Sequence, residues 1–444
     1  MDLKLNNSER YRKILLLAAP LVGAMLSQNL LNLVDSFMIG RLGKHSLAAV
    51  AAGGVITWLA CSIVISLSTG VQQLSSRRHG EGNHSETALP LNAGLITALC
   101  IGIPMALILC FFTEEIMGLV SNDSKVIKLG SEYLFVTFLG IPLNGVNFCF
   151  RGFWNGVNRQ KVYMYTLFII HGTNIILNYL LIFGKFGFPE MGVKGAAVAT
   201  VISLGIGTCI YIYISFKTLR PMGFLSKVPT LVFKNLLKLS ISNAIQSFLY
   251  ALSYNVIYKI IAQLGTDELA AAGIIIHFAL VCYLPAMAFG LVATSLVGQS
   301  LGRKDITEAR QWASDIAKLS VLILGIASLP LILIPKQLLS VFILEQETVS
   351  VAVTAVRILG VSIFIEAQAL TMMHSLLGAG DSKRVMLISI LMQWGIYIPL
   401  GWLLGLILNQ GLNGVWTANL ITQISMAGIY TYLWKRGNWK EIDI

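Results

Sequence analysis

Two carboxylic acids in this sequence lie inside long apolar stretches, where a charged side chain is costly. Asp35 falls within the apolar stretch of residues 14–40, and Glu366 falls within the stretch 350–377, whereas nearly all other acids fall in loops or at helix ends. A charge near the middle of a bilayer costs about 2.5–3.5 kcal/mol on insertion scales and is usually functional. Asp35 and Glu366 are therefore the candidates for ion or proton chemistry. For Glu366, ion binding and a purely structural polar network are equally open.

Asp35 belongs to a stripe of polar residues on one face of a predicted helix. Gln28, Asn32 and Asp35 are spaced i, i+4 and i+7, and this spacing places side chains on the same face. One hypothesis is that Asp35 takes up a proton from outside and releases it inside the cell. The alternative is an acid at the helix end that pairs with Arg41. We favour proton coupling because the whole stripe is polar on an otherwise apolar helix.

A second polar stripe lies in the predicted helix 162–184. His171, Asn174 and Asn178 follow the spacing i, i+3 and i+7 in a segment otherwise rich in Ile, Leu and Phe. This face could lie against Asp35 and form a polar pocket with it. The alternative is a set of hydrogen bonds that only holds helices together, typically ~0.6 kcal/mol per contact. Both interpretations are open at this point.

Pro20 is a candidate hinge in the helix that carries Asp35. A proline inside a helix removes a backbone hydrogen bond and often produces a kink. Pro20 precedes Asp35 by 15 residues, so protonation of Asp35 could be converted into bending at Pro20. A hinge here is a hypothesis, since many such prolines mark static kinks.

The composition shows which elements must hold these residues. Of the 444 residues, 56% are hydrophobic and 12% are charged, whereas charged residues make up about a quarter of an ordinary soluble domain. A helix needs about 20 apolar residues to cross the hydrocarbon core. We predict an all-α polytopic membrane protein with twelve transmembrane helices, near residues 14–40, 46–72, 88–113, 128–152, 162–184, 192–216, 235–261, 270–298, 316–343, 350–377, 385–408 and 413–434.

The basic residues predict which way the chain faces. If the N-terminus is cytoplasmic, 23 of the 32 Lys and Arg residues fall on the cytoplasmic side, and an excess of basic residues marks that side of a membrane protein. We therefore predict a multi-pass protein of the cytoplasmic (inner) membrane with both termini in the cytoplasm. The net charge of +11 belongs to these loops, so no nucleic-acid partner is expected.

The second half of the sequence repeats the first at an offset of 222 residues, half the chain length. The three clearest matches, each between predicted helices, are Leu42-Gly43 with Leu264-Gly265, Gly80 with Gly302, and Gly156 with Gly378. Each half would contain six helices, so both halves enter and leave the membrane on the same side. We predict an N-lobe of residues 1–222 and a C-lobe of residues 223–444, related by a pseudo-two-fold axis along the membrane normal.

Signatures of enzymes and ATP-driven pumps are absent from the sequence. There is no GxxxxGK[ST] phosphate loop, no HExxH and no GxSxG. The six cysteines lack the CxxC spacing of a metal site. We therefore expect neither an enzyme nor a bound metal or cofactor, and the energy for transport would come from an ion gradient.

The sequence resembles the multidrug and toxic compound extrusion (MATE) family over its whole length. The resemblance rests on the order and spacing of Ala19-Pro20-Leu21, Val34 to Gly40 with Leu42-Gly43, Asn174 to Tyr179, Gly195 to Thr200, and Glu366-Ala367 leading to Leu377 to Asp381. It implies a V-shaped pair of six-helix lobes around a large central cavity. It also implies export of amphipathic, often cationic, drugs in exchange for H+ or Na+.

The resemblance further implies roles for particular residues. Asp35 matches the first-helix aspartate that such exporters use for proton coupling. The polar residues that match the pocket beside it are Asn174, Asn178 and Thr200. Glu366 falls where sodium-coupled members often carry an acid, but Tyr250 stands where those members carry a glutamate. This departure weakens a sodium site in the C-lobe and favours protons acting at Asp35.

Taken with the resemblance, the sequence predicts a proton-coupled exporter of small amphipathic or cationic drugs, with Asp35 as the coupling carboxylate, acting as a monomer in the bilayer. Its polar pocket is predicted to contain Gln28, Asn32, His171, Asn174, Asn178 and Thr200. One alternative is a sodium-coupled drug antiporter that uses a second cation site at Glu366 and Tyr250. The other is a flippase for lipid-linked precursors, which should have a cationic cavity, whereas this sequence places acids inside its spans.

Overall fold

The computed structural model describes residues 6–342 and 345–442, and these residues form helices and no strand. The α-helices are α1 (Asn7–Gly40), α2 (Lys44–Ile65), α3 (Leu67–Gly80), α4 (Leu89–Phe111), α5 (Thr113–Gly118), α6 (Ser124–Leu139), α7 (Ile141–Gly156), α8 (Gln160–Phe183), α9 (Gly192–Thr218), α10 (Thr230–Ala262), α11 (Thr266–Gly302), α12 (Ile306–Leu333), α13 (Pro335–Ser340), α14 (Gln346–Gly378), α15 (Ser382–Met392), α16 (Ile398–Trp402) and α17 (Gly411–Arg436). Short 3-10 or π segments connect or extend them: η1 (His84–Glu86), η2 (Lys185–Gly187), η3 (Arg220–Met222), η4 (Gln393–Tyr397), η5 (Leu403–Ile407) and η6 (Asn438–Glu441).

Most of these helices are long and apolar enough to cross a bilayer. In the described part of the chain, nine helical segments meet this condition, and α6 with α7 makes a tenth that bends by 49°. Two further helices, α10 and α17, contain 33 and 26 residues, so they are long enough to cross although they are less apolar. These segments correspond to the predicted spans, and the predicted class of an all-α polytopic membrane protein is confirmed.

Several predicted spans are not the continuous α-helices that the apolar pattern suggested, and two of them show this most clearly. The span predicted over residues 128–152 is broken between Leu139 and Ile141. Pro142 stands in the first turn of α7, where its missing N–H removes no helical bond but where it ends the preceding helix. The span predicted over 385–408 contains the π-helical stretches η4 and η5. Apolar periodicity finds such spans but not their breaks.

The chain divides into two compact units. The N-unit is Gly23–Ala244, and the C-unit joins the described residues up to Val22 with those from Ile245 onward. The divisions fall inside α1 and α10, so each of these helices contributes to both units. The division into an N-lobe of residues 1–222 and a C-lobe of residues 223–444, which was based on the sequence repeat, stays a prediction.

The backbone repeats at the same offset of 222 residues as the sequence. Residues with positive φ occur in four pairs at this offset: Gly43 (104°) and Gly265 (155°), Gly82 (74°) and Lys304 (60°), Asn158 (58°) and Gly380 (90°), and Gly187 (86°) and Asn409 (55°). A left-handed backbone is common for Gly and Asn but unusual for other residues. The two halves therefore turn the chain at corresponding positions even where the residue types differ.

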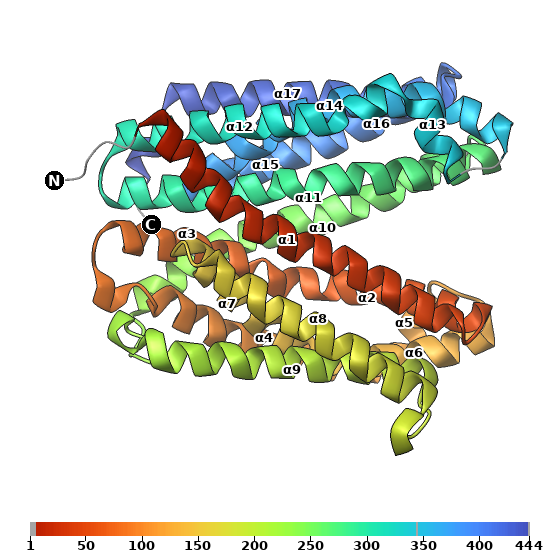
Figure 1. Cartoon of the computed structure of the whole chain (residues 1–444), viewed down its shortest axis with the longest axis horizontal. Helices are drawn as coiled ribbons and strands as arrows, with labels where there is room; N and C mark the ends of the chain where they lie inside the picture. The colour runs from red at the N-terminus through yellow and green to blue at the C-terminus, as the bar shows by residue number, and fades with distance from the viewer. Residues whose placement is uncertain (1–5, 343–344, 443–444) are drawn as a thin grey trace. The chain divides into compact units, whose positions relative to one another are not determined.

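One helix is central to the packing of each unit. In the N-unit α7 packs against α2, α3, α4 and α9, and in the C-unit α14 lies beside α11, α12 and α17 (Figure 1). Glycines permit this close approach. A Cβ added at Gly152 of α7 would lie 2.1 Å from the carbonyl oxygen of Ser68, and one at Gly378 of α14 would lie 2.6 Å from that of Thr294. Small residues at helix crossings are typical of membrane bundles.

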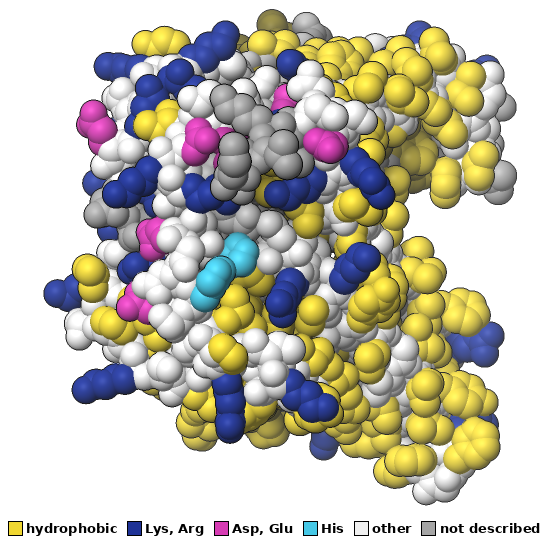
Figure 2. All heavy atoms as spheres, turned by 60° about the vertical axis from the view of Figure 1, so that its left-hand side comes forward, with side chains coloured by type: hydrophobic (Ala, Val, Ile, Leu, Met, Phe, Trp, Pro, Cys, Tyr) yellow, Lys and Arg dark blue, Asp and Glu magenta, His cyan; other side chains and the backbone are white. Residues whose placement is uncertain are grey.

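The lipid-facing surfaces of both units are apolar. Leu33 and Leu107 of the N-unit are 66% and 53% exposed, and Leu333 and Leu391 of the C-unit are 69% and 62% exposed. Large exposed apolar surfaces are rare in soluble monomers and are expected where hydrocarbon surrounds the helices. Figure 2 turns the helix ends that carry the chain termini toward the viewer and shows many Lys and Arg side chains there.

Candidate functional site

Asp35 lies near the C-terminal end of α1 and is bonded to α8. The side-chain amide of Asn178 donates to Oδ1 of Asp35 at 2.6 Å. Asn178 is fully buried and Asn174 is 2% exposed, whereas Asp35 is partly accessible. A hydrogen bond to an ionised carboxylate is shorter and stronger than a neutral one. The polar face of α8 is therefore the partner of the acid on α1.

The hydrogen bonds continue from Asn178 to α9. The amide of Asn178 also donates to Oδ1 of Asn174 at 2.9 Å, and the Asn174 amide donates to Oγ1 of Thr200 at 3.2 Å. The Thr200 hydroxyl donates to the carbonyl of Ala196 at 3.0 Å, so its oxygen is left to accept. With the Asn174 amide turned over, its nitrogen donates to Oδ1 of Asp35 at 3.3 Å instead. In both orientations these residues are connected, and we call Asp35, Asn174, Asn178 and Thr200 the Asp35 cluster.

The remaining predicted pocket residues form a second group nearer the N-terminus of α1. Nε2 of Gln28 donates to Oδ1 of Asn32 at 3.2 Å, and Nε2 of His171 lies 3.1 Å from Oε1 of Gln28. Because an amide oxygen only accepts, His171 donates this bond. His171 is 6% exposed, while Gln28 and Asn32 are exposed. α1 and α8 of the N-unit are thus linked at two levels along their length.

Two residues of this region were not found from the sequence. Oγ of Ser27 lies 3.1 Å from Nδ1 of His171, and Tyr133 of α6 interacts electrostatically with Asp35. Ser27 lies off the face marked by Gln28 and Asn32, so helical periodicity gave no reason to select it. Nothing in the sequence of α6 connects Tyr133 with Asp35, and only the tertiary packing shows that the two residues interact.

Arg41 is not the partner of Asp35. Its guanidinium lies over the ring of Phe37, 4.6 Å from the ring centroid. Among the residues that the structure describes, Asp35 makes no ion pair. The alternative interpretation of Asp35 as an interfacial acid paired with Arg41 is therefore wrong, and neutral amides are what hold the carboxylate.

In the C-unit, Glu366 of α14 lies among tyrosine side chains. The tyrosines that interact electrostatically with it are Tyr250, Tyr254, Tyr283 and Tyr397. The rings of Tyr250 and Tyr254 are 5.5 Å apart between centroids and inclined by 58°. The structure thus brings Glu366 and Tyr250 into one cluster, together with three tyrosines that sequence reasoning missed. Across residues 6–342 and 345–442, no group of three or more His, Cys, Asp or Glu is placed to hold a metal ion.

α1 is helical through Pro20. The division between the two units falls between Val22 and Gly23, two residues beyond this proline. Pro20 therefore stands where α1 passes from the C-unit to the N-unit, and Asp35 lies farther along the same helix. The hinge hypothesis therefore places the bend close to the point where α1 passes from one unit to the other.

A family model described as MatE matches the chain twice, over residues 20–180 and over residues 243–403. Together these segments cover more than half of the chain. The chain belongs to the MatE family. The double match agrees with the repeated turns of the backbone, because each matched segment falls in one half of the repeat.

Individual MatE-family relatives resemble the chain over nearly its whole length. The probable multidrug resistance protein YoeA of Bacillus subtilis is 26% identical over 438 residues, which cover 96% of this chain and 94% of that protein. A multidrug resistance MATE family transporter in an outward-facing conformation has a TM-score of 0.88 at 19% identity, covering 98% of this chain and 97% of the other. VcmN of Vibrio cholerae, solved as an aspartate-to-asparagine mutant, has a TM-score of 0.87 at 21% identity, covering 98% and 99%. These two structures show that the fold is shared.

Proposed function

We propose that this MatE-family protein is a multidrug efflux antiporter that exports amphipathic or cationic compounds in exchange for protons, with Asp35 as the coupling carboxylate. The observation that carries the proposal is the hydrogen bond from Asn178 to Asp35 inside helices that are otherwise apolar. The name of YoeA as a probable multidrug resistance protein supports the substrate class. We further propose that the protein acts as a monomer in the cytoplasmic membrane with both termini in the cytoplasm.

Protonation of Asp35 would change the bond between α1 and α8. The ionised carboxylate accepts a charge-assisted bond from Asn178, and neutralising it weakens that bond. α1 would then be held less firmly against α8 in the N-unit. Because Pro20 lacks an N–H, one carbonyl of the preceding turn has no helical donor, and α1 can bend there. A proton taken from outside would thus alter the polar pocket and release a bound drug.

The energetics of this exchange are adequate. One elementary charge that moves through a membrane potential of 100 mV supplies ~2.3 kcal/mol. Since 1.4 kcal/mol corresponds to about a tenfold ratio of concentrations, one proton supports useful accumulation of a neutral drug outside the cell. Exchange of one proton for a drug with a single positive charge moves no net charge, so the pH gradient drives that exchange. No ATP site or bound cofactor is needed for this cycle.

The direct test is drug efflux by an Asp35→Asn variant in proteoliposomes with an imposed pH gradient. Asparagine keeps the size of the side chain but cannot exchange a proton, so we expect loss of proton-driven efflux. Asp123→Asn is the matched control, because Asp123 is an exposed acid in the loop before α6. Efflux at the wild-type rate by Asp35→Asn would overturn the proposal.

A sodium-coupled antiporter that uses Glu366 is the second candidate. The tyrosine hydroxyls around Glu366 could supply neutral oxygen ligands to a cation, and this cluster is the observation in its favour. The weakness of the sodium-coupled candidate is that Tyr250 stands where sodium-coupled members of the family carry a second acid. Two vesicle experiments separate the candidates. In one, a pH gradient drives efflux in the absence of sodium; in the other, a sodium gradient drives efflux in the absence of a pH gradient. Loss of efflux only in Glu366→Gln would favour sodium coupling.

The hinge at Pro20 is tested separately. In Pro20→Ala the missing N–H is restored and α1 becomes harder to bend. We expect slower efflux with drug binding retained, measured by equilibrium binding of a fluorescent substrate. Normal transport by Pro20→Ala would exclude a hinge at this position and leave the role of Asp35 untouched.

A further inference from the structure

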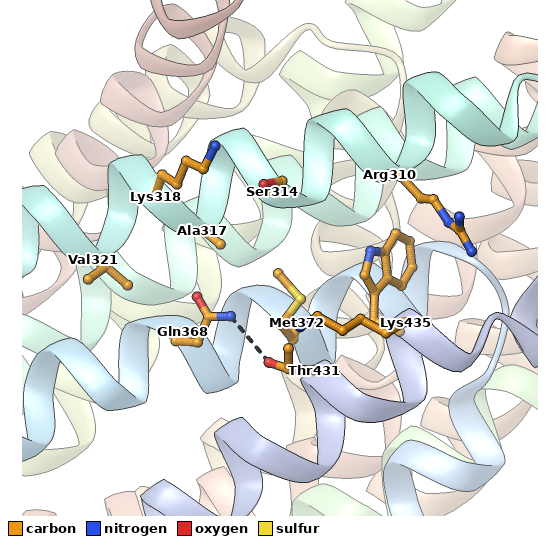
Figure 3. Close-up of a pocket in the computed structure, with 10 residues that line it drawn as sticks. Arg310, Ser314, Ala317, Lys318, Val321, Gln368, Met372, Thr431 and Lys435 are labelled. Atoms are coloured by element: carbon orange, nitrogen blue, oxygen red, sulfur yellow. Dashed lines mark hydrogen bonds between the residues drawn. The ribbon is translucent and has the colours of Figure 1, made fainter.

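A cavity of about 590 Å³ lies in the C-unit between α12, α14 and α17. Three basic residues line it: Arg310 and Lys318 from α12, and Lys435 from α17 (Figure 3). All three side chains are exposed, and none makes an ion pair with another described residue. No acidic residue lines the cavity. The cavity therefore carries an uncompensated positive charge and is complementary to an anion.

The spacing on α12 explains why the charges face one cavity. Arg310, Ser314 and Lys318 follow the spacing i, i+4 and i+8, which places them on one side of the helix. On the opposite wall, Nε2 of Gln368 donates to Oγ1 of Thr431 at 3.2 Å. This bond ties α14 to α17 and leaves the Ser314 hydroxyl and the three cations as donors for a ligand.

The cavity extends from the helix ends into the apolar part of the helices. Arg310 is four residues from the start of α12 and Lys435 is one residue from the end of α17. Lys318 is twelve residues into α12, which is about 18 Å along a straight helix. Ala317 and Val321 also line it, and Figure 3 shows Val321 at the end away from Arg310. Arg310 and Lys435 thus stand near the helix ends, and Lys318 lies deeper, beside the apolar side chains.

Trp434 lies beside Lys435 in the last turn of α17 and also lines the cavity. Its ring stacks on Trp439 of η6 at 4.0 Å with an interplanar angle of 6°. The indole N–H of Trp439 donates to the carbonyl of Trp434 at 2.8 Å, which fixes the chain after α17. Arg310 and Lys435 thus stand at the ends of membrane-spanning helices, where such helices reach the lipid headgroups.

We propose that this cavity binds an anionic glycerophospholipid of the surrounding leaflet. The lipid phosphate lies between Arg310 and Lys435, Lys318 adds positive charge from farther along α12, and an acyl chain lies along Ala317 and Val321. Basic pockets between transmembrane helices have the chemistry to hold lipid headgroups. A cationic drug is repelled by the three charges, and a free phosphate leaves the apolar end unfilled. The site is separate from the Asp35 cluster, which lies in the N-unit.

Native mass spectrometry of the full-length protein in a neutral detergent tests this site. The probes are dioctanoyl-phosphatidylglycerol, dioctanoyl-phosphatidylcholine and inorganic phosphate. We compare the wild type with the triple variant Arg310→Gln, Lys318→Gln, Lys435→Gln. The matched control is Lys383→Gln, an exposed lysine in the first turn of α15, in the same unit but outside the cavity. Phosphatidylglycerol should bind about 100-fold more weakly to the triple variant, since each Lys or Arg near a membrane surface contributes roughly fivefold.

Several outcomes would overturn the lipid site. Equal binding of phosphatidylcholine would show that charge is not recognised, and competition by millimolar inorganic phosphate alone would show a free-anion site. Equal loss in Lys383→Gln would show a general surface effect. A second measurement does not depend on folding of the triple variant. Phosphatidylglycerol with brominated acyl chains should quench the tryptophan fluorescence of Val321→Trp more than that of the wild type, and equal quenching would contradict the proposed position of the acyl chain.

Discussion

The amide of Asn178 donates a hydrogen bond of 2.6 Å to Oδ1 of Asp35, and Asn178 is fully buried in α8. The same amide also donates to Asn174 at 2.9 Å. In this orientation of Asn174 both amide hydrogens of Asn178 are used on two acceptors. With the Asn174 amide turned over, Asp35 instead accepts from two amides, those of Asn178 and Asn174. Asn178 thus fixes the position of the carboxylate on which the proposed coupling depends.

Replacing Asn178 by Leu should impair efflux without unfolding the N-unit. A hydrogen bond to a charged group contributes about 1.5–3 kcal/mol, so we expect proton-driven efflux to fall by roughly 10- to 100-fold. Efflux rates in proteoliposomes measure this, with thermal unfolding in detergent as a check on folding. Tyr179→Phe is the control, because Tyr179 is the next residue on α8 and is 46% exposed. An unchanged rate in Asn178→Leu would mean that Asp35 does not need this donor.

Helical periodicity selected Asp35, Asn174 and Asn178 of the Asp35 cluster, whereas Thr200 was selected only through the resemblance to the MATE family. The i, i+3, i+7 spacing on α8 placed Asn174 and Asn178 on one face, and membrane helices turn such faces toward partners because lipid offers no hydrogen bonds. Ser27 and Tyr133 were missed because their roles depend on which helices pack together. One sequence without tertiary contacts does not contain that information.

The repeat was visible in the sequence, whereas the matching left-handed backbone conformations in the two halves were not. Lys304 corresponds to Gly82, and both have positive φ, although a lysine gives no sign of a left-handed turn. Pro142 indicates a possible kink near the break at Gly140 between α6 and α7, but the apolar run continues across this point and does not show that the helix ends. Local backbone geometry of this kind is set by packing around the turn, and residue types record it only in part.

We expect Gly→Ala substitution to have opposite effects on stability at Gly152, where α7 crosses α3, and at Gly172 of α8. A Cβ at Gly152 would lie 2.1 Å from the backbone oxygen of Ser68, whereas a Cβ at Gly172 of α8 meets no atom within 4 Å. Gly152→Ala must push two helix backbones apart, and overpacking of this kind costs about 1–3 kcal/mol. Gly172→Ala should be neutral or stabilise the helix by up to roughly 1 kcal/mol. Thermal unfolding in detergent compares them, and equal midpoints would contradict the packing at this crossing.

Asp123 predicts a pH-dependent contribution to stability. Its carboxylate caps α6 by accepting from the backbone N–H groups of Lys125 at 2.8 Å and Val126 at 3.4 Å, and it lies 3.2 Å from Nδ1 of His45. The backbone N–H of Lys125, followed by Val126 and His45, lowers the pKa of Asp123 below its ordinary value of 3.8. Because the folded pKa is the lower one, this stability is present above pH 3.8 and is lost as the pH falls through the folded pKa.

Asp123→Ala should therefore unfold at a lower temperature than the wild type at pH 7. The difference should shrink as the pH falls from 3.8 through the lower folded pKa, where the carboxylate of the folded wild type also becomes protonated. Asp123→Asn is the control, since asparagine caps a helix about as well as aspartate without a charge. A difference between Asp123→Ala and wild type that does not change with pH would show that the carboxylate charge plays no part.

The N-terminal part of α1 is attached to α12 by a pair of charges within the C-unit. Nε of Arg10 lies 2.5 Å from Oδ2 of Asp315, with the two side chains 6% and 14% exposed. The Arg10 guanidinium also lies 3.9 Å from the centroid of the Trp312 ring. Breaking a buried pair by removing one partner costs about 3–5 kcal/mol, because the other charge is left without compensation.

Asp315→Leu should therefore lower the unfolding temperature strongly, since it leaves Arg10 buried beside an apolar side chain. The double variant Arg10→Met, Asp315→Leu should recover part of the loss, because apolar replacement of a whole buried pair is often neutral. Arg12→Gln is the control, as Arg12 is an exposed residue on the same turn of α1. Thermal unfolding of the wild type, Arg10→Met, Asp315→Leu and the double variant measures the coupling between Arg10 and Asp315. If the double variant is as unstable as the sum of its single changes, the two charges do not interact, and α1 must be held to α12 by the apolar contacts and the Trp312 ring alone.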